Sequence, residues 1–274
     1  MAEPQSQNAA LTADPVEKPP THYFTIASRG KTIAGGVSGL VERLPNGHAI
    51  KSAWPGDDKN ICEEDMDREA RAYQRLFECF GAHERFVKSI AYDESEHALT
   101  MEFMSNGTLR EYLEANNSRV PQDQRHQWIL AMAQGMEMLH SANILHCDFN
   151  PRNMLLDERL EVKVADFGCV AIESAKSSAG GCVRFYPPRV LKRKRFEADD
   201  DLFALGSSIF EVLTGKPPYE DLETRPIQKL YWVRQFPDLT GLDLADIIRD
   251  CWLFRGRSAC DIHQRLVAAV PLRL

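Results

Sequence analysis

The feature that most constrains this chain is a segment with one aspartate and two asparagines that is followed, after a short interval, by a tripeptide that begins with a second aspartate. The segment reads His146-Cys147-Asp148-Phe149-Asn150-Pro151-Arg152-Asn153, and Asp166-Phe167-Gly168 begins thirteen residues after its last position. Phosphoryl transfer gives such groups definite tasks, because one aspartate orients the attacking hydroxyl and accepts its proton, while an asparagine and a second aspartate hold Mg²⁺. A loop aspartate is ordinarily a turn former or a helix cap, and that alternative stands for either aspartate alone. Asp148, Asn153 and Asp166 in this order and spacing favour phosphoryl transfer.

Length, charge and cysteine content limit which classes of protein this chain can belong to. The 274 residues, 43% of them apolar and 27% charged, can bury a full core and divide once into two lobes. A formal net charge of -7 argues against a general nucleic-acid binder, which needs a surplus of Lys and Arg on one face. Seven cysteines without a Cys-x-x-Cys pair suit a reducing compartment, so we expect free thiols.

Sequence patterns that would direct the chain to a membrane are lacking. The N-terminus has no charged-then-apolar signal pattern, and no run approaches the roughly 18 uncharged apolar residues of a spanning helix. We therefore expect a cytoplasmic protein without a membrane partner. The basic run 192–195 is a nuclear signal, a contact for an acidic substrate or, as the neighbouring acidic residues favour, a solvated loop, so a nuclear location stays open.

The order of the expected elements divides the chain into a tail and two lobes. Residues 1–22 contain four prolines and lack aromatic residues, so we expect a disordered tail. Short β-favouring runs then surround one amphipathic helix at 65–80; the runs are 23–27, 39–44, 48–53 and 98–103. The pattern then becomes mostly helical, with helices expected at 108–116, after Pro121, at 201–214 and at 242–252, and short strands at 154–156 and 162–164. A small, mainly β lobe thus precedes a larger, mainly α lobe.

A glycine-rich segment and a lysine lie in the expected β region. The segment 34–41 sits between two strand-like runs, where backbone without Cβ atoms can approach phosphates, although such hairpins also occur for steric reasons alone. Lys51 is either the solvated member of an alternating strand or a phosphate contact held by a carboxylate, for which Glu69 is the best candidate. The neighbouring acidic residues are expected to form a solvated helix start, namely Glu63, Glu64, Asp65 and Asp67.

Together these motifs resemble those of eukaryotic-type protein kinases, over residues 23–268. The resemblance implies an α+β, two-lobed kinase domain at 23–270, with an N-lobe at about 23–103, a C-lobe at about 105–270, and ATP and Mg²⁺ in the cleft. The implied catalytic residues are Asp148, Lys51, Arg152 and Asn153, with Asn153 and Asp166 as metal ligands. The implied cofactor-binding residues are Ala34, Gly36 and Gly39 in the phosphate loop, Val41, Ala49 and Leu155 around adenine, Met101, Glu102 and Met104 at the gatekeeper and hinge, and Lys51, Glu69 and Asp166. The implied partner is a protein substrate, and we expect a monomer.

Two further features extend the resemblance into the larger lobe. The stretch from Asp201 to Gly206 is similar to the family's buried Asp-x-Trp-x-x-Gly helix, with Phe203 in place of tryptophan. Tyr73, His146 and Phe167 correspond to an apolar column that couples the lobes. For Tyr73 and Phe167 that role coincides with ordinary core packing.

Cys147 departs from the family pattern beside the expected base. The family usually has an arginine here that pairs with a phosphorylated activation loop, and without its guanidinium a phosphate loses its usual partner. We therefore predict activity that does not depend on phosphorylation of Ser174, Ser177 or Ser178. Cys147, Cys169 and Cys182 all map to this region and are either small core residues or a redox control.

The charge pattern also departs from the family at two other places. Asn150 stands where Ser/Thr kinases have a lysine, and Arg152 supplies the positive charge, an arrangement that resembles many tyrosine kinases. Arg189 reverses the family's glutamate, which pairs with an arginine near the position of Arg257. Either Arg257 moves aside or an acidic residue such as Glu211 or Asp250 intervenes.

Three functions stay open at this point. The leading interpretation is an ATP- and Mg²⁺-dependent protein kinase that modifies Ser or Thr more readily than Tyr. A kinase-like small-molecule phosphotransferase has a similar catalytic loop, although such enzymes usually lack the Phe-Gly that follows Asp166 here. A pseudokinase that binds ATP without efficient transfer is suggested by Cys147, Asn150 and Arg189.

Overall fold

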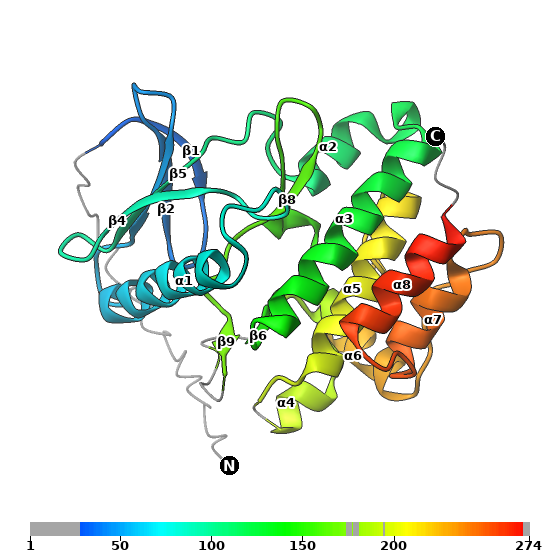
Figure 1. Cartoon of the computed structure of the whole chain (residues 1–274). Coiled ribbons are helices and arrows are strands. Elements are labelled where there is room, and N and C mark those ends of the chain that lie inside the picture. Colours follow the sequence, from blue (N-terminus) through cyan, green and yellow to red (C-terminus); the bar gives the residue numbers. More distant parts are fainter. Residues whose placement is uncertain (1–27, 174–176, 178–180, 194, 271–274) are drawn as a thin grey trace, which may run out of the picture.

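The computed structural model describes residues 28–173, 177, 181–193 and 195–270, and these residues form two lobes (Figure 1). The smaller lobe holds a β-sheet and one long helix, and the larger lobe is mainly helical. The expected two-lobed α+β fold is thereby confirmed. The expected tail at 1–22 and strand at 23–27 lie outside the described residues.

Five antiparallel strands form the sheet of the small lobe, in the spatial order β1-β2-β3-β5-β4. Their bounds are Lys31–Gly35, Gly39–Arg43, Ala49–Ala53, Ala98–Met101 for β5 and Ser89–Asp93 for β4. A turn at Pro45 to Gly47 joins β2 to β3, and the N–H of Leu44 donates to His48 O at 2.8 Å across it. Strands β1 and β4 were not among the predicted elements. Their side chains are mostly exposed, so they lack the alternation by which a half-buried strand is recognised.

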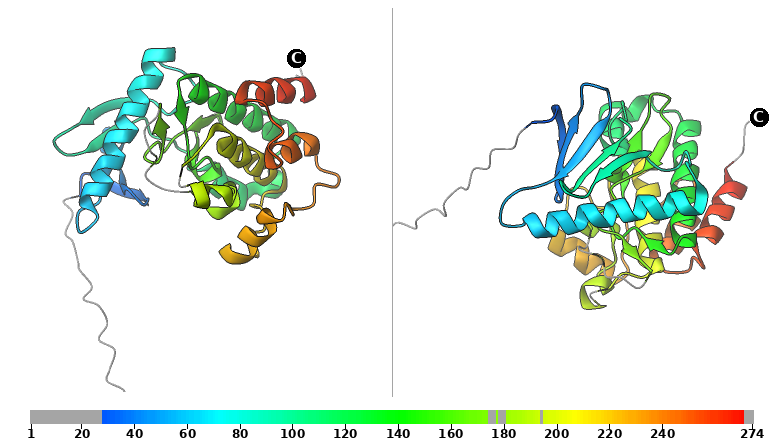
Figure 2. Two further views of the ribbon diagram at one scale, coloured as in Figure 1. Left: turned by 90° about the horizontal axis from the view of Figure 1, so that it is seen from below. Right: turned by 60° about the vertical axis from the view of Figure 1, so that its left-hand side comes forward.

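The helix of the small lobe, α1, runs from Lys59–Phe80 and crosses in front of the sheet (Figure 2). It begins six residues before the predicted start at 65. Its buried positions recur at intervals of three or four residues, which is the spacing of one helix face; they include Cys62, Met66, Glu69, Tyr73 and Leu76. This face places a carboxylate, Glu69, among apolar side chains.

The larger lobe is built around two long helices, α3 (Gln122–Ser141) and α5 (Ala198–Thr214). The apolar stripe predicted on α3 is fully buried, since Trp128, Met132, Met136 and Leu139 are each at most 1% exposed. The other helices are α2 (Leu109–Asn116), α4 (Arg189–Arg193), α6 (Thr224–Trp232), α7 (Ala245–Trp252) and α8 (Ala259–Ala269). Among the described helices, none combines the length and apolarity that crossing a bilayer requires.

Helix α5 has two positions that place other elements. The Asp201 carboxylate accepts from the N–H groups of His146 and Cys147 at 2.7 and 3.0 Å, which fixes the loop that carries Asp148. A Cβ on Gly206 would lie 2.6 Å from the Cβ of Cys251, so only glycine allows α7 to pack this closely. These contacts explain why an aspartate and a glycine are needed on one buried helix.

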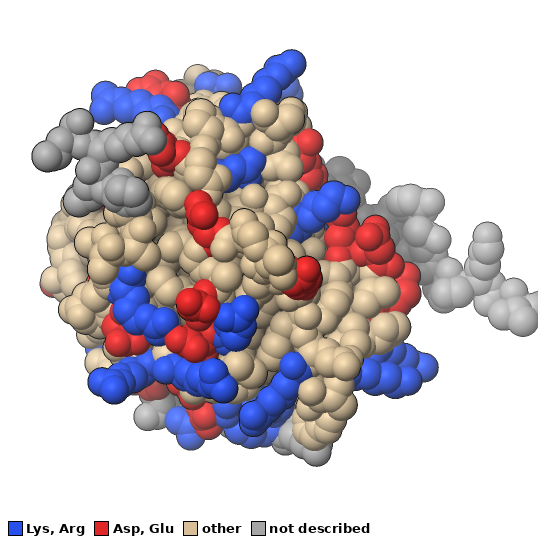
Figure 3. Space-filling view, turned by 90° about the vertical axis from the view of Figure 1, so that its right-hand side faces the viewer, with Lys and Arg blue, Asp and Glu red and all other residues tan. Residues whose placement is uncertain are grey.

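Helices α7 and α8 form the outer face of the larger lobe, where basic and acidic side chains intermingle (Figure 3). Arg249 pairs with Asp246, and Arg265 pairs with Asp250, both at 2.7 Å. The first pair is exposed and the second is partly exposed, and pairs of this kind contribute little to stability. Helix α8 is held instead by its buried side chains Ala259, Ile262 and Leu266, on the side that packs against α3.

Four short strands complete the part of the large lobe nearest the sheet. Strand β7 (Met154–Leu156) pairs with β8 (Val162–Val164), both with the predicted bounds, and β6 (Ile144–Leu145) pairs with β9 (Ala171–Ile172). The N–H of Ala165 donates to Asn153 O at 2.9 Å. This pairing brings the two acidic motifs of the sequence side by side.

Candidate active site

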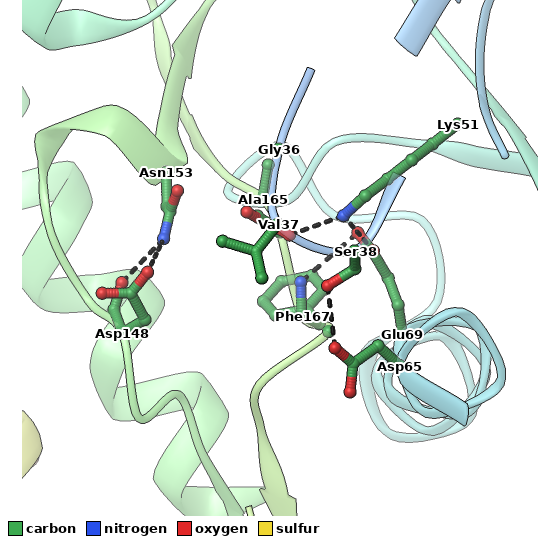
Figure 4. Close-up of polar contacts among 12 residues, drawn as sticks. Gly36, Val37, Ser38, Lys51, Asp65, Glu69, Asp148, Asn153, Ala165 and Phe167 are labelled. Atoms are coloured by element: carbon green, nitrogen blue, oxygen red, sulfur yellow. Dashed lines mark hydrogen bonds and ion pairs between the residues drawn. The ribbon is translucent and has the colours of Figure 1, made fainter. Parts of the chain in front are cut away.

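Three side chains far apart in sequence meet at Lys51 (Figure 4). The Lys51 Nζ donates to Glu69 Oε2 and to Asp166 Oδ1, each at 2.6 Å. Glu69 is 1% exposed, and its second oxygen accepts from the N–H of Phe167 at 3.3 Å. Strand β3, helix α1 and the loop after β8 are therefore tied together by one lysine and one glutamate.

The protonation states of this cluster follow from its charges. Burial alone would lower the pKa of Lys51, but the carboxylates of Asp166 and Glu69 outweigh it and raise that pKa above its ordinary value. The Lys51 ammonium in turn lowers the pKa of Asp166. Both groups are therefore ionised at neutral pH, as a phosphate contact and a metal ligand must be.

The catalytic loop holds the Asp148 carboxylate with two side-chain amides. Asn150 Nδ2 donates to Oδ1 and Asn153 Nδ2 donates to Oδ2, each at 3.0 Å, and both amides also donate to the Asp148 carbonyl. The orientation of the proposed base is thus set by amides and not by a cation. Arg152 is exposed, and its backbone N–H donates to Asn150 Oδ1 at 3.0 Å.

Two described residues of the activation segment, Gly181 and Cys182, lie next to the Asp148 carboxylate. A Cβ on Gly181 would lie 2.2 Å from Asp148 Oδ1, so glycine is required at this close approach. The backbone N–H of Cys182 donates to the same carboxyl group. Burial raises the pKa of Asp148 above its ordinary value, although the amide of Asn153 and the N–H of Cys182 act in the opposite direction.

An apolar column connects the lobes behind the site. The ring of Phe167 lies 4.8 Å from that of Tyr73 and 5.6 Å from that of His146, measured between centroids. The His146 ring also donates from Nε2 to Ala165 O at 3.2 Å and accepts at Nδ1 from the N–H of Asp148 at 3.3 Å. The three residues expected to stack do meet, and His146 adds a polar link between the two acidic motifs.

The residues expected around adenine come together through strand register. Val41 lies opposite Lys51 in the β2–β3 pair, and Ala49 lies opposite Met101 in the β3–β5 pair. Leu155 comes from β7 of the larger lobe, and it is half-buried. The register thus places these side chains at the boundary of the two lobes, beside the cluster of Lys51, Glu69 and Asp166.

The hinge residue Glu102 has its side chain turned to the far side of the sheet. Its Oε1 accepts from Lys163 Nζ and from the N–H of Lys88, both at 2.7 Å, and its own N–H donates to Lys88 O. It lines a hollow of about 1140 Å³ between α1 and the β4–β5 hairpin, which Lys51, Asp148 and Asp166 do not line. Because the N–H of Glu102 is already used, its carbonyl is the backbone group that suits an adenine contact.

The donor set suits Mg²⁺. Asn153 uses its amide nitrogen on Asp148, which leaves Oδ1 as the atom for a metal, and the ionised Asp166 side chain is 47% exposed. Carboxylate and amide oxygens are the ligands that Mg²⁺ prefers. Asn153 and Asp166 would hold the ion, which would neutralise phosphate charge during transfer.

The expectation of a solvated acidic helix start was wrong. Helix α1 begins at Lys59, so the acidic residues lie inside it, and Asp65 is only 5% exposed. Its Oδ2 accepts from Ser38 Oγ at 2.8 Å, and Asp67 accepts from Tyr92 and His97 of the β4–β5 hairpin. Ser38 was not among the candidate residues, because a serine in a glycine-rich turn carries no signal of a distant partner.

The partner of Arg189 is neither Glu211 nor Asp250. Arg189 Nε donates to Asp200 Oδ1 at 3.0 Å, and its guanidinium lies 3.5 Å from the centroid of the Phe254 ring. The two other candidates pair elsewhere, Glu211 with Arg110 and Asp250 with Arg265. Arg257 is exposed, so the two arginines avoid each other. Asp200, fully buried at the start of α5, also accepts from Arg193.

Cys147 occupies the family's arginine position with a buried, neutral thiol. It is 2% exposed, and burial raises the pKa of its thiol, which disfavours the reactive thiolate. The side chain of Ser177 hydrogen-bonds this thiol. Ser174 and Ser178 lie outside the described residues. All seven cysteines are free, as expected.

Sequence comparison agrees with this geometry. The family model described as "Protein kinase domain" matches residues 31–249, which is most of the chain. The chain belongs to the protein kinase family. It is 29% identical to the serine/threonine/tyrosine-protein kinase HT1 of Arabidopsis thaliana over 69% of this chain and 50% of that protein. It is 27% identical to the human mitogen-activated protein kinase kinase kinase 11, over 79% of this chain and 27% of that protein. The kinase domain thus spans half or less of the length of these relatives.

Proposed function

We propose that this kinase domain transfers the γ-phosphoryl group of ATP, with Mg²⁺, to a hydroxyl of a protein substrate, and that it prefers serine or threonine to tyrosine. The observation that carries the proposal is the closed cluster of Lys51, Glu69 and Asp166 at 2.6 Å, beside an Asp148 carboxylate held by two amides. The serine/threonine preference is supported by relatives that are named serine/threonine-protein kinases, whereas the name of HT1 also includes tyrosine. A location in the cytoplasm or nucleus remains a prediction.

Each group has one task in this reaction. The Lys51 ammonium binds the phosphates, and Glu69 holds it there from behind. Asn153 and Asp166 bind the metal. Asp148 accepts a hydrogen bond from the substrate hydroxyl, orients its oxygen toward the phosphorus and takes its proton. The raised pKa of Asp148 makes its carboxylate a stronger base than an exposed one.

The segment over Asp148 supports one alternative. Gly181 and the N–H of Cys182 occupy the space next to the carboxylate, where a substrate hydroxyl has to approach. A domain that keeps this arrangement would bind ATP but transfer phosphate poorly, as a scaffold. A small-molecule phosphotransferase is less well supported, because Phe167 packs in the apolar column and Asp201 anchors the catalytic loop, as expected from the protein-kinase motifs.

One assay separates these functions. The purified chain is incubated with Mg²⁺, labelled ATP and generic protein substrates, and phosphoamino acids are identified after hydrolysis. An active kinase labels serine or threonine, and Asp166→Ala lowers the rate by about 10²-fold or more. Binding of ATP without transfer, in the wild-type chain, would contradict the proposal and favour a scaffold.

A further inference from the structure

The tip of the glycine-rich loop is closed and points a serine inward. The N–H of Gly36 donates to Gly39 O at 2.9 Å, which makes a tight turn between β1 and β2. Within that turn Val37 is 91% exposed, whereas Ser38 is 7% exposed. A small polar side chain is thus buried at the place where the loop meets helix α1 (Figure 4).

Ser38 belongs to a hydrogen-bond chain that joins three segments of the site. Its Oγ donates to Asp65 Oδ2 at 2.8 Å, and Arg68 Nη1 donates to Asp65 Oδ1 at 2.5 Å. The same Arg68 nitrogen donates to Gly168 O at 2.7 Å. The chain therefore runs from the glycine-rich loop, through α1, to the loop that carries Asp166.

This arrangement is more than a local pairing within a helix. Arg68 and Asp65 are three residues apart and could pair on any exposed helix. Here the carboxylate is 5% exposed and takes its second donor from a residue 27 positions earlier in the chain. If the loop moved away from α1, the buried Asp65 carboxylate would lose a hydrogen-bond donor without gaining water in its place. The Ser38 contact therefore stabilises the loop against moving away from the helix.

Two more contacts determine how the loop backbone is turned. Trp54 Nε1 donates to Gly36 O at 2.8 Å, and Cys62 Sγ donates to Val37 O at 3.8 Å. In a trans peptide the carbonyl of one residue and the N–H of the next point in opposite directions. The N–H groups of Val37 and Ser38 are therefore turned away from Trp54 and Cys62, as consecutive donors of an anion-binding loop are.

We propose that Asp65 is a positioning residue that holds the glycine-rich loop closed before nucleotide arrives, with Ser38 as its partner on the loop and Arg68 as its link to Gly168. The inference rests on the proposed ATP-dependent function. A loop ordered in advance costs less entropy when ATP binds, so affinity is gained without a direct contact between Asp65 and the nucleotide.

The test compares Ser38→Ala, Asp65→Ala, the double variant and Ser38→Thr with wild type in the full chain. The readouts are the dissociation constant of Mg²⁺ATP, KM and kcat for transfer, and amide hydrogen exchange of residues 36–39 without nucleotide. Ser52→Ala is the matched control, because Ser52 is a half-buried serine of the neighbouring strand β3 whose buried hydroxyl has no hydrogen-bond partner among the described residues.

Ser38→Ala is expected to speed exchange at 36–39 and to weaken ATP binding about tenfold, which is the worth of a hydrogen bond to a charged group. Asp65→Ala should weaken it at least as much, and the double variant should be no weaker than Asp65→Ala. Ser38→Thr keeps the hydroxyl and should stay within about twofold of wild type, as should Ser52→Ala. KM for ATP should rise more than kcat falls.

Unchanged exchange and unchanged ATP affinity in Ser38→Ala would overturn the inference, as would strictly additive effects in the double variant. If Asp65→Ala fails to fold, the comparison of Ser38→Ala with Ser38→Thr still tests whether the Ser38 hydroxyl holds the loop. Absence of transfer by the wild-type chain refutes the proposed function instead, and exchange and ATP binding then still report on Ser38 and Asp65.

Discussion

The ion pair at Lys51 keeps the charges typical of the family, whereas the pair at Arg189 reverses them, and both are closed in the structure. In the proposed reaction the Lys51 ammonium has to meet phosphates, so the reaction dictates the sign of its charge. At Arg189 the charge has to neutralise a buried partner, and here that partner is Asp200. The difference separates what the chemistry requires from what the fold requires.

The largest effect is expected at the pair that the reaction dictates. Lys51→Arg keeps the charge but replaces a compact ammonium by a planar guanidinium, so the domain should fold and transfer should fall at least 10²-fold. Lys216→Met removes an exposed lysine that pairs with Glu220 and serves as the control. Rates of phosphate transfer and melting temperatures are measured together. Near-normal transfer by a folded Lys51→Arg would remove the distinction between the two pairs.

The second effect is expected at the reversed pair. Arg189→Glu restores the family's residue, but it places a carboxylate against the buried Asp200, so the free energy of unfolding should fall by about 2–3 kcal/mol. Arg193 still pairs with Asp200 in this variant, so the loss of stability should be smaller than for a buried carboxylate left without any partner. Arg189→Lys should cost less, and both variants should retain transfer well below their melting temperatures. Denaturant unfolding measures the loss, and a stabilised Arg189→Glu would contradict the assignment of Asp200.

Another departure from the family exchanges a cation for an amide at Asn150, beside the proposed base. Because burial raises the pKa of Asp148, and a protonated carboxyl cannot accept the substrate proton, activity should fall on acidification at a pH above the ordinary carboxyl range. Asn150→Ala removes a hydrogen-bond donor that favours the ionised carboxylate of Asp148. The pH at which activity is lost on acidification, the acidic limb of the profile, should therefore move still higher, and kcat should fall about tenfold. The pH profile of kcat/KM measures both. Asn116→Ala, on α2, is the control, and an unmoved limb would show that Asn150 does not act through Asp148.

The sequence was most informative where a side chain has a task in the reaction. Lys51, Asp148, Asn153 and Asp166 occur at spacings that predicted their proximity, and the structure brings them together. The partners that position them were harder to predict. The partner of Asp65 is Ser38, which lies 27 positions earlier in the turn between β1 and β2, so the pattern of the helix alone indicated a solvated residue. Asp200 lies in the first turn of α5, and nothing in its sequence neighbourhood indicates that Arg189 packs against it. Such pairings depend on tertiary contacts, which local pattern does not encode.

The smallest effect concerns Cys147, where the family's arginine is replaced by a thiol. Lys51 and Glu69 are already paired, and Arg68 and Arg75 hold α1 through the carbonyls of Gly168 and Ala142, so no phosphate is needed to dock this helix. A phosphate on Ser177 would meet a neutral buried thiol. Phosphatase treatment, Ser177→Ala and Ser177→Asp should therefore each leave kcat/KM within about twofold of wild type. Cys147→Arg provides the contrast, since a guanidinium there should make the rate sensitive to phosphatase. Loss of activity in the phosphatase-treated wild-type domain would show that a cation other than the missing arginine receives a phosphate.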